Sequence, residues 1–202
     1  MGKAYILILP LLLWLGGCTI HHDLTDDYDK YLASQRAQTE WPTTEAFHRY
    51  ALTPLTEKNH FELHIGAHSW EVDPARIIDA TMASKDIQNA FGPMAKSMQL
   101  ENSDQPLMIF HLQWYSFDNF AAHIVLKASL VEHGEERFRK TYSGSGSDQY
   151  SKIYWGAGLA MRNAIQESTK QALDAILRQL AVDLNAMPAQ ANTAAARQMQ
   201  QP

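Results

Sequence analysis

Three sets of side chains in this sequence could react or bind a ligand, and they lie far apart along the chain. The first is Cys18, the only cysteine, which follows two glycines. A thiolate is the strongest nucleophile among the side chains, so Cys18 could be a site of covalent attachment. The second set is a group of histidines between residues 60 and 68, and the third is a group of aromatic residues beside two expected turns.

The histidines belong to a segment that alternates apolar and polar residues over 61–70, which predicts one strand with one buried face. The polar positions are His60, Glu62, His64 and His68. On a single strand these side chains share a face, so neighbours such as Glu62 and His64 could hold a metal ion. The alternative is a solvent-facing strand rich in histidine. Because no second ligand cluster is evident, we expect no metal.

The aromatic residues surround a turn expected at 115–119 and precede the C-terminal helix. If both places lie at one edge of a sheet, the rings could line an apolar groove for a lipid or a protein partner. The alternative is ordinary packing in the core and the turns. The groove residues would be Trp114, Tyr115, Phe117, Phe120, Tyr154 and Trp155, with Tyr150 beside them.

The N-terminus has the pattern of a secretory signal. Lys3 precedes an almost wholly apolar run over residues 4–15, and small residues follow it. The run is shorter than the roughly 20 apolar residues that a membrane-spanning helix needs.

The end of this run, Leu15-Gly16-Gly17-Cys18, resembles the lipobox of bacterial lipoproteins. The resemblance implies cleavage before Cys18 and lipid attachment to its sulfur. With Thr19 rather than Asp as the next residue, it also implies a place on the outer membrane, facing the periplasm. The alternative is a buried cysteine in an uncleaved apolar segment.

Composition narrows the classes of function. The formal net charge of −5 argues against a nucleic-acid partner, which requires a basic patch. Lipidation of Cys18 would leave no cysteine for a disulfide, thiol catalysis or a zinc site. The pairs Gly144-x-Gly146 and Gly156-x-Gly158 lack the further glycine of a dinucleotide loop, and no nucleophile motif is present. We therefore expect no cofactor and no enzymatic activity.

The pattern of the remaining chain predicts an α+β fold. Residues 107–114, 120–132 and 137–143 have the features of three consecutive antiparallel strands, with a turn at 133–134. Short helices are expected over 75–83 and from Ser84 to an interruption at Gly92. The strongest helix spans 159–185. Together these predict a mainly antiparallel sheet of about four strands, two or three helices packed on one face, and a long C-terminal helix.

The expected domain organisation has four parts. Residues 1–17 are the lipoprotein signal peptide, and 18–60 are a lipidated tether with a helix possible over 23–38. Residues 61–185 form an α/β periplasmic domain. Residues 186–202 are rich in Ala and Gln and are expected to be disordered.

The order of elements also resembles YajG-like lipoproteins and the auxiliary lipoproteins of ABC-type lipid transporters. The likeness rests on the strand Leu107-Met108-Ile109-Phe110-His111-Leu112, a hairpin over 122–142, a glycine-containing loop over 144–158 and a helix over 159–184. It implies helices on one face of the sheet and a non-enzymatic role in the envelope. Cys18 is the only functional residue that the resemblance assigns to this sequence.

The leading hypothesis is an outer-membrane lipoprotein that acts as an accessory or binding subunit of an envelope complex, in lipid transport or envelope maintenance. Its partners would be the membrane, through the lipid anchor, an envelope protein, and a lipid ligand. The alternative is a regulator of the cell-wall (peptidoglycan) synthesis machinery that reaches its partner through the 18–60 tether. A third hypothesis is a His-dependent metal-binding protein or hydrolase.

Overall fold

The computed structural model describes residues 20–23, 27–35, 49–52, 61–65, 68–92 and 106–187. Cys18, His60, the expected signal peptide and nearly all of the expected C-terminal tail lie outside these ranges. The elements in chain order are β1 (Ile20–Asp23), α2 (Tyr28–Ser34), β2 (Arg49–Leu52), β3 (Phe61–Ile65), β4 (His68–Val72), α3 (Pro74–Met82), α4 (Lys85–Phe91), β5 (Leu107–Asp118), β6 (Ala121–Glu132), β7 (Glu135–Ser145) and α5 (Tyr150–Ala186). The predicted α+β fold class is confirmed.

The larger sheet has the strand order β2-β5-β6-β7. Strand β2 pairs in parallel with β5, whereas β5, β6 and β7 pair antiparallel, as predicted. Both hairpin turns have two residues with positive φ, Asn119 and Phe120 in one and His133 and Gly134 in the other. Such turns match the right-handed twist of the strands that they join. The predicted turn at 133–134 is therefore confirmed.

The turn expected at 115–119 is wrong, because β5 continues to Asp118. A register shift between Leu112 and Trp114 marks a β-bulge. Leu112 is buried before the bulge and Phe117 after it, so the inward side changes from even to odd positions. Simple alternation along the sequence does not reveal this change.

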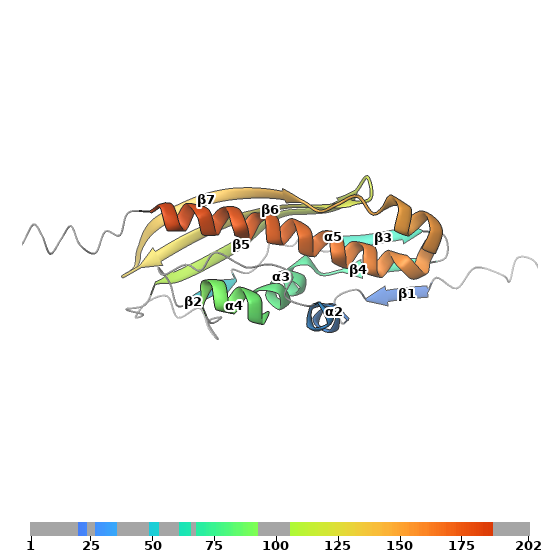
Figure 1. The fold of residues 1–202 in the computed structure, drawn as a ribbon, viewed down its shortest axis with the longest axis horizontal. Helices are drawn as coiled ribbons and strands as arrows, with labels where there is room; N and C mark the ends of the chain where they lie inside the picture. Colours follow the sequence, from blue (N-terminus) through green and yellow to red (C-terminus); the bar gives the residue numbers. More distant parts are fainter. Residues whose placement is uncertain are drawn as a thin grey trace, which may run out of the picture.

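Helix α5 lies along β6 and β7 (Figure 1). One face of this helix is a buried stripe with helical spacing; its members are Ile165, Thr169, Ala172, Ile176, Leu180 and Leu184. The helix begins at Tyr150, nine residues before the predicted start. The expected loop over 144–158 is therefore too long, and Gly156 lies inside the helix.

Two glycines at the end of β7 allow this helix to approach the sheet. A Cβ atom at Gly144 would stand 2.5 Å from the carbonyl oxygen of Ala172, and one at Gly146 would stand 2.0 Å from that of Ser168. Backbone atoms cannot yield as a flexible side chain can. Glycine at 144 and 146 is thus required for the close packing of α5 on the sheet.

The expected single strand over 61–70 is wrong. Strands β3 and β4 are separate and pair antiparallel, with residues 66–67 between them. Strand β1 pairs in parallel with the other edge of β4, which gives a second sheet of order β1-β4-β3. The ring of His22 stacks on that of Trp70, 5.3 Å away between centroids.

The segment expected as a tether also contributes to the folded domain. Tyr28 of α2 is fully buried, and its hydroxyl lies 3.2 Å from that of Thr81 in α3. Asp27 forms an ion pair with Arg162 of α5. A helix was expected over 23–38, but residues 20–23 form β1 and the helix spans Tyr28–Ser34. Residues 20–23, 27–35 and 49–52 of this segment thus pair or pack with the rest of the described fold.

The short helices α3 and α4 lie where the sequence predicts them. Pro74 starts α3, and the Asp73 carboxylate accepts hydrogen bonds from the backbone N–H groups of Ala75 and Arg76. Ser84 is the N-cap residue of α4, and Gly92, with a φ of 98°, ends that helix. None of the helices in the described ranges is both long and apolar enough to cross a membrane.

A clamp joins the C-terminal part of α5 to β7. The Asp183 carboxylate accepts hydrogen bonds from the Tyr142 hydroxyl and the Lys140 ammonium, each at 2.6 Å. The bond from Lys140, followed by that from Tyr142, lowers the pKa of Asp183 below its ordinary value of 3.8. Burial, followed by the hydrogen bond to Asp183, raises the pKa of Tyr142.

Replacing Gly146 by alanine should lower the free energy of unfolding by roughly 1–3 kcal/mol or more, because the new methyl group meets the backbone of α5. Denaturant unfolding followed by circular dichroism measures the change. The matched control is Gly134→Asn, where no atom lies within 4 Å and asparagine tolerates positive φ. Equal losses at both positions would contradict the close packing of α5.

Asp183→Asn should destabilise the fold by roughly 1 kcal/mol at neutral pH, since the hydrogen bonds act on the ionised carboxylate. The pKa of Asp183 is lower in the folded than in the unfolded chain. This stabilisation is therefore complete above pH 3.8 and is lost as the pH falls through the folded-state pKa. The free energies of unfolding of the parent chain and the Asp183→Asn variant should therefore become equal as the pH falls through this acidic range.

The control for that pH series is Asp174→Asn. Burial, the largest cause, raises the pKa of Asp174 above 3.8 in spite of the hydrogen bond from Lys170. Ionisation of Asp174 then lowers the stability of the parent chain as the pH rises above 3.8. The free energy of unfolding of the variant should therefore increase relative to that of the parent chain over this range. The same pH dependence in both variants would contradict these assignments.

Candidate functional site

The start of α5 and the β5–β6 turn carry a series of touching aromatic rings that faces solvent. We call Phe120, Tyr150, Tyr154 and Trp155 the aromatic surface. The rings of Phe120 and Tyr150 meet edge to face at 5.0 Å, and those of Tyr150 and Tyr154 stack at 5.6 Å. Trp155 meets Tyr154 edge to face at 5.1 Å. Because Tyr154 is 62% exposed and Trp155 83% exposed, this series is available to a ligand.

Local backbone contacts hold these rings together. Tyr150 and Tyr154 are four residues apart on the helix and so share a face. The backbone N–H of Gln149 donates to the carbonyl oxygen of Phe120 at 2.9 Å. The backbone N–H of Tyr150 donates to the Asp148 carboxylate at 2.6 Å. These bonds tie the first turn of α5 to the β5–β6 turn.

Phe120 adopts a strained backbone conformation. Its φ is 62°, in the left-handed region that a bulky residue seldom occupies. A two-residue turn of this kind favours glycine after asparagine, yet here phenylalanine follows Asn119. Such strain costs about 1 kcal/mol or more and persists where the surroundings enforce it. The exposed ring is thus kept at an energetic cost.

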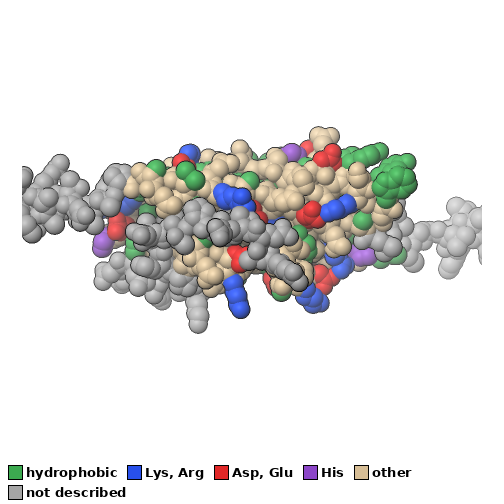
Figure 2. Space-filling view, in the orientation of Figure 1, with side chains coloured by type: hydrophobic (Ala, Val, Ile, Leu, Met, Phe, Trp, Pro, Cys, Tyr) green, Lys and Arg blue, Asp and Glu red, His purple; other side chains and the backbone are tan. Residues whose placement is uncertain are grey.

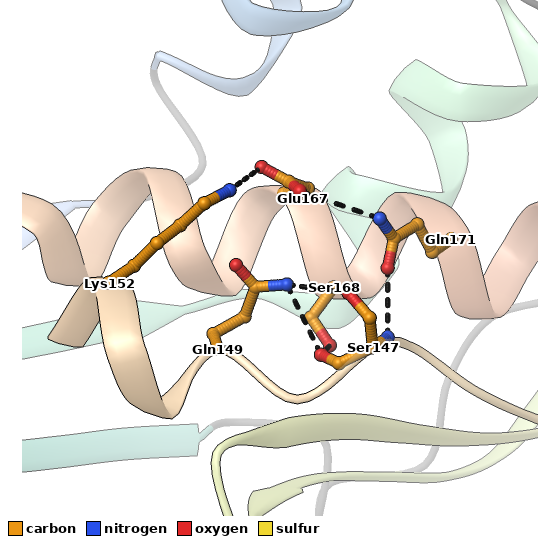
Figure 3. A network of polar contacts seen from close by, with 6 residues as sticks. All are labelled: Ser147, Gln149, Lys152, Glu167, Ser168 and Gln171. Atoms are coloured by element: carbon orange, nitrogen blue, oxygen red, sulfur yellow. Dashed lines mark hydrogen bonds and ion pairs between the residues drawn. The ribbon is translucent and has the colours of Figure 1, made fainter.

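A buried serine anchors the loop before α5 (Figure 3). The Ser168 hydroxyl accepts a hydrogen bond from the backbone N–H of Ala122 at 2.9 Å and donates to the carbonyl oxygen of Ser147 at 3.1 Å. The side-chain amide of Gln149, itself buried, donates to the Ser147 hydroxyl at 2.7 Å. These contacts connect α5, β6 and the loop in one network.

The outer part of the same network lies near solvent. Gln171 accepts a hydrogen bond from the backbone N–H of Ser147 at 2.8 Å. Glu167 forms an ion pair with Lys152 and receives a hydrogen bond from Gln171 (Figure 3). The network therefore positions the start of α5. Its polar groups bond to one another and to the backbone, so their role is structural.

The structure separates the residues that were expected to line one groove. Tyr115 faces α5, where its hydroxyl lies 2.9 Å from that of Thr169, and Phe117 is buried in the core. Trp114 precedes Tyr115 on the strand and points to the opposite side of the sheet, where it is 59% exposed. Of the predicted set, Phe120, Tyr154 and Trp155 come together, with Tyr150 among them.

The histidine positions are also divided. Glu62 and His64 remain alternate positions of β3, whereas His68 belongs to β4, where it pairs with Ile65. His60 lies outside the described residues, as does Cys18. Among the side chains that the structure describes, no three His, Cys, Asp or Glu residues converge in a metal-binding arrangement.

Sequence reasoning did not identify the positioning residues Ser168 and Gln149. A small polar residue beside an apolar helical stripe gives only a weak signal of a buried hydrogen bond. Its partners, the backbone of residues 122 and 147, come from distant parts of the sequence. The available signal is the pair of glycines at 144 and 146, since glycine permits a close approach of backbone.

The aromatic surface lies at one end of the long axis of the molecule. Figure 1 places the start of α5, the β5–β6 turn and the start of β1 at the same end. Figure 2 shows exposed hydrophobic side chains gathered there. Ile20, the first residue of β1, is 50% exposed.

Comparison with known proteins gives likeness of structure alone. No protein-family model matches the chain, and no curated protein matches it. Protein XCC0632 from Xanthomonas campestris, of the family DUF330, is similar with 12% sequence identity and a TM-score of 0.48, covering 73% of this chain and 91% of that chain. The hypothetical protein CT253 from Chlamydia trachomatis is similar with 9% identity and a TM-score of 0.43, covering 69% and 99%. These likenesses assign no family or function to the chain.

Proposed function

We propose that this chain is a lipoprotein, anchored through Cys18 to the periplasmic face of the outer membrane, that acts as a non-enzymatic binding subunit of an envelope complex. The observation that carries the proposal is the sequence Leu15-Gly16-Gly17-Cys18 after a basic residue and an apolar run. Thr19, in place of Asp, supports the outer membrane as the destination.

A binding role is supported by a contrast between polar and aromatic side chains: polar hydroxyls make internal contacts, whereas several aromatic rings are exposed. The hydroxyls of Ser168 and Thr81 serve contacts between elements. The exposed rings of Tyr154 and Trp155 instead offer a surface to a partner. In such a subunit, specificity comes from shape and apolar contact and not from a reactive group.

The place of the N-terminal segment favours an accessory subunit over a regulator that reaches across the periplasm. Cys18 is separated from β1 by Thr19 alone. Strand β1 pairs with β4, and α2 is held by the buried Tyr28. The folded domain would consequently remain near the membrane that holds the anchor, and its partner would be found there.

The anchor is tested by replacing Cys18 with alanine. Metabolic labelling with palmitate should be abolished, and the precursor should keep its signal peptide, because no thiolate is left to accept the lipid. Labelling and electrophoretic mobility report both events. Gly17→Ala is the matched control, since a small residue is retained before the cysteine and labelling should persist. Normal labelling of the Cys18→Ala chain would refute the anchor.

The binding role is tested by crosslinking in intact envelopes. Recovery of the acylated chain should yield a defined envelope protein at a constant ratio, and the Cys18→Ala chain should lose it. The identity of that protein separates a transport or maintenance complex from the cell-wall machinery. Recovery of the chain alone, with acylation intact, would contradict a role as a complex subunit.

A further inference from the structure

We propose that the aromatic surface is a membrane-contact site that sits in the interfacial layer of the bilayer holding the anchor. Its ligand is the lipid surface, and its effect is to fix how the domain stands on the membrane. The inference rests on the proposed lipid anchor at Cys18 and adds a second, non-covalent contact. One covalent anchor leaves the domain free to rotate, whereas a second contact gives it one orientation.

The position of the anchor is the first argument. Only Thr19 lies between Cys18 and Ile20. Their Cα atoms are therefore two Cα–Cα steps apart, a span of at most about 7 Å whatever the conformation. Strand β1 begins at the end of the molecule where α5 begins and where the β5–β6 turn lies (Figure 1). A bilayer that holds an acylated Cys18 would thus lie next to the end that carries the aromatic surface.

The residue types are the second argument. Tyrosine and tryptophan concentrate at membrane interfaces, where the ring enters the apolar layer and the polar atom meets the headgroups. Trp155 is 83% exposed and Tyr154 62% exposed at this end, and Ile20 is half-exposed. Such side chains in water are unfavourable unless a partner covers them.

The strain at Phe120 is the third argument. Glycine would fit this turn position without strain, yet the chain has phenylalanine there with a φ of 62°. The ring extends the series through its contact with Tyr150. Strained residues held by their surroundings often mark functional sites. Here the strain presents one more apolar ring at the same end.

Charge indicates that the contact is apolar. The chain has a formal net charge of −5, so it gains no general attraction to anionic lipid. On the first turns of α5, Lys152 is already paired with Glu167. Contact made by the aromatic surface should consequently change little with salt, unlike contact made by a basic patch.

The test uses the acylated full chain purified from membranes. Mass spectrometry of its N-terminal peptide first establishes the lipid on Cys18. The protein is then reconstituted into phosphatidylethanolamine–phosphatidylglycerol vesicles whose acyl chains carry bromine near the carbonyl end, and tryptophan fluorescence is compared with that in unbrominated vesicles. Trp155→Phe removes the proposed reporter, and Trp114→Phe is the matched control, an exposed tryptophan on the opposite side of the sheet.

Bromine should quench the parent chain and the Trp114→Phe chain, and most of the quenching should be lost in Trp155→Phe. The signal should persist at high salt. Equal quenching in Trp155→Phe and the parent chain would overturn the proposal. Fluorescence of Trp155 that changes with protein concentration and not with lipid would also overturn it, because this result indicates contact with a second copy or a protein partner. Absence of lipid on Cys18 would instead overturn the proposed function, so the two failures are distinguishable.

Phe120→Gly gives a second measurement. Glycine relieves the backbone strain, so the unfolding midpoint should stay the same or rise, while quenching at Trp155 should weaken because the surface loses a ring. A lower midpoint with unchanged quenching would show that Phe120 serves the fold alone, and would count against the membrane contact.

Discussion

Helix α5 can lie as close as it does to strands β6 and β7 only because residues 144 and 146 are glycine. The carbonyl oxygen of Ser168 occupies the space in which a side chain at position 146 would begin. At the same place the Ser168 hydroxyl bridges β6 and the loop before the helix, so close packing and buried hydrogen bonds reinforce each other. At the other end, the Asp183 clamp holds the helix to β7. The helix is thus held at its middle and near its C-terminal end, and the hydrogen bond from Gln149 to Phe120 holds its first turn.

That fixed first turn gives the aromatic surface its geometry. Tyr150 and Tyr154 take their spacing from the helix, and Phe120 reaches them from the β5–β6 turn because Gln149 is hydrogen-bonded to its carbonyl group. The rings of Tyr154 and Trp155 remain largely exposed. As the proposed membrane contact, these rings would meet the same bilayer as the proposed lipid anchor at Cys18.

The N-terminal segment links the expected anchor to the folded domain without a long spacer. Strand β1 completes the small sheet, with His22 stacked on Trp70, and Tyr28 of α2 is buried beside Thr81 of α3. The Asp27–Arg162 ion pair joins this segment to α5. The described parts of this N-terminal segment thus pack against the domain. This packing holds Ile20 in a defined position relative to the aromatic surface. This relation is what a domain oriented on a membrane would require.

Local pattern was sufficient to predict the three antiparallel strands, the turn at 133–134 and the short helices α3 and α4, because each depends on residues close in sequence. The break of residues 61–70 into a hairpin, the bulge after Leu112 and the packing of α2 depend on partners far along the chain, which periodicity does not contain. The same holds for the site. The residue types suggested an aromatic ligand surface, but the bulge turned Tyr115 and Phe117 inward, and only long-range packing brought Phe120 to the helix. The resemblance of Leu15-Gly16-Gly17-Cys18 to a lipobox comes from the sequence alone, because such a motif is recognised without a fold.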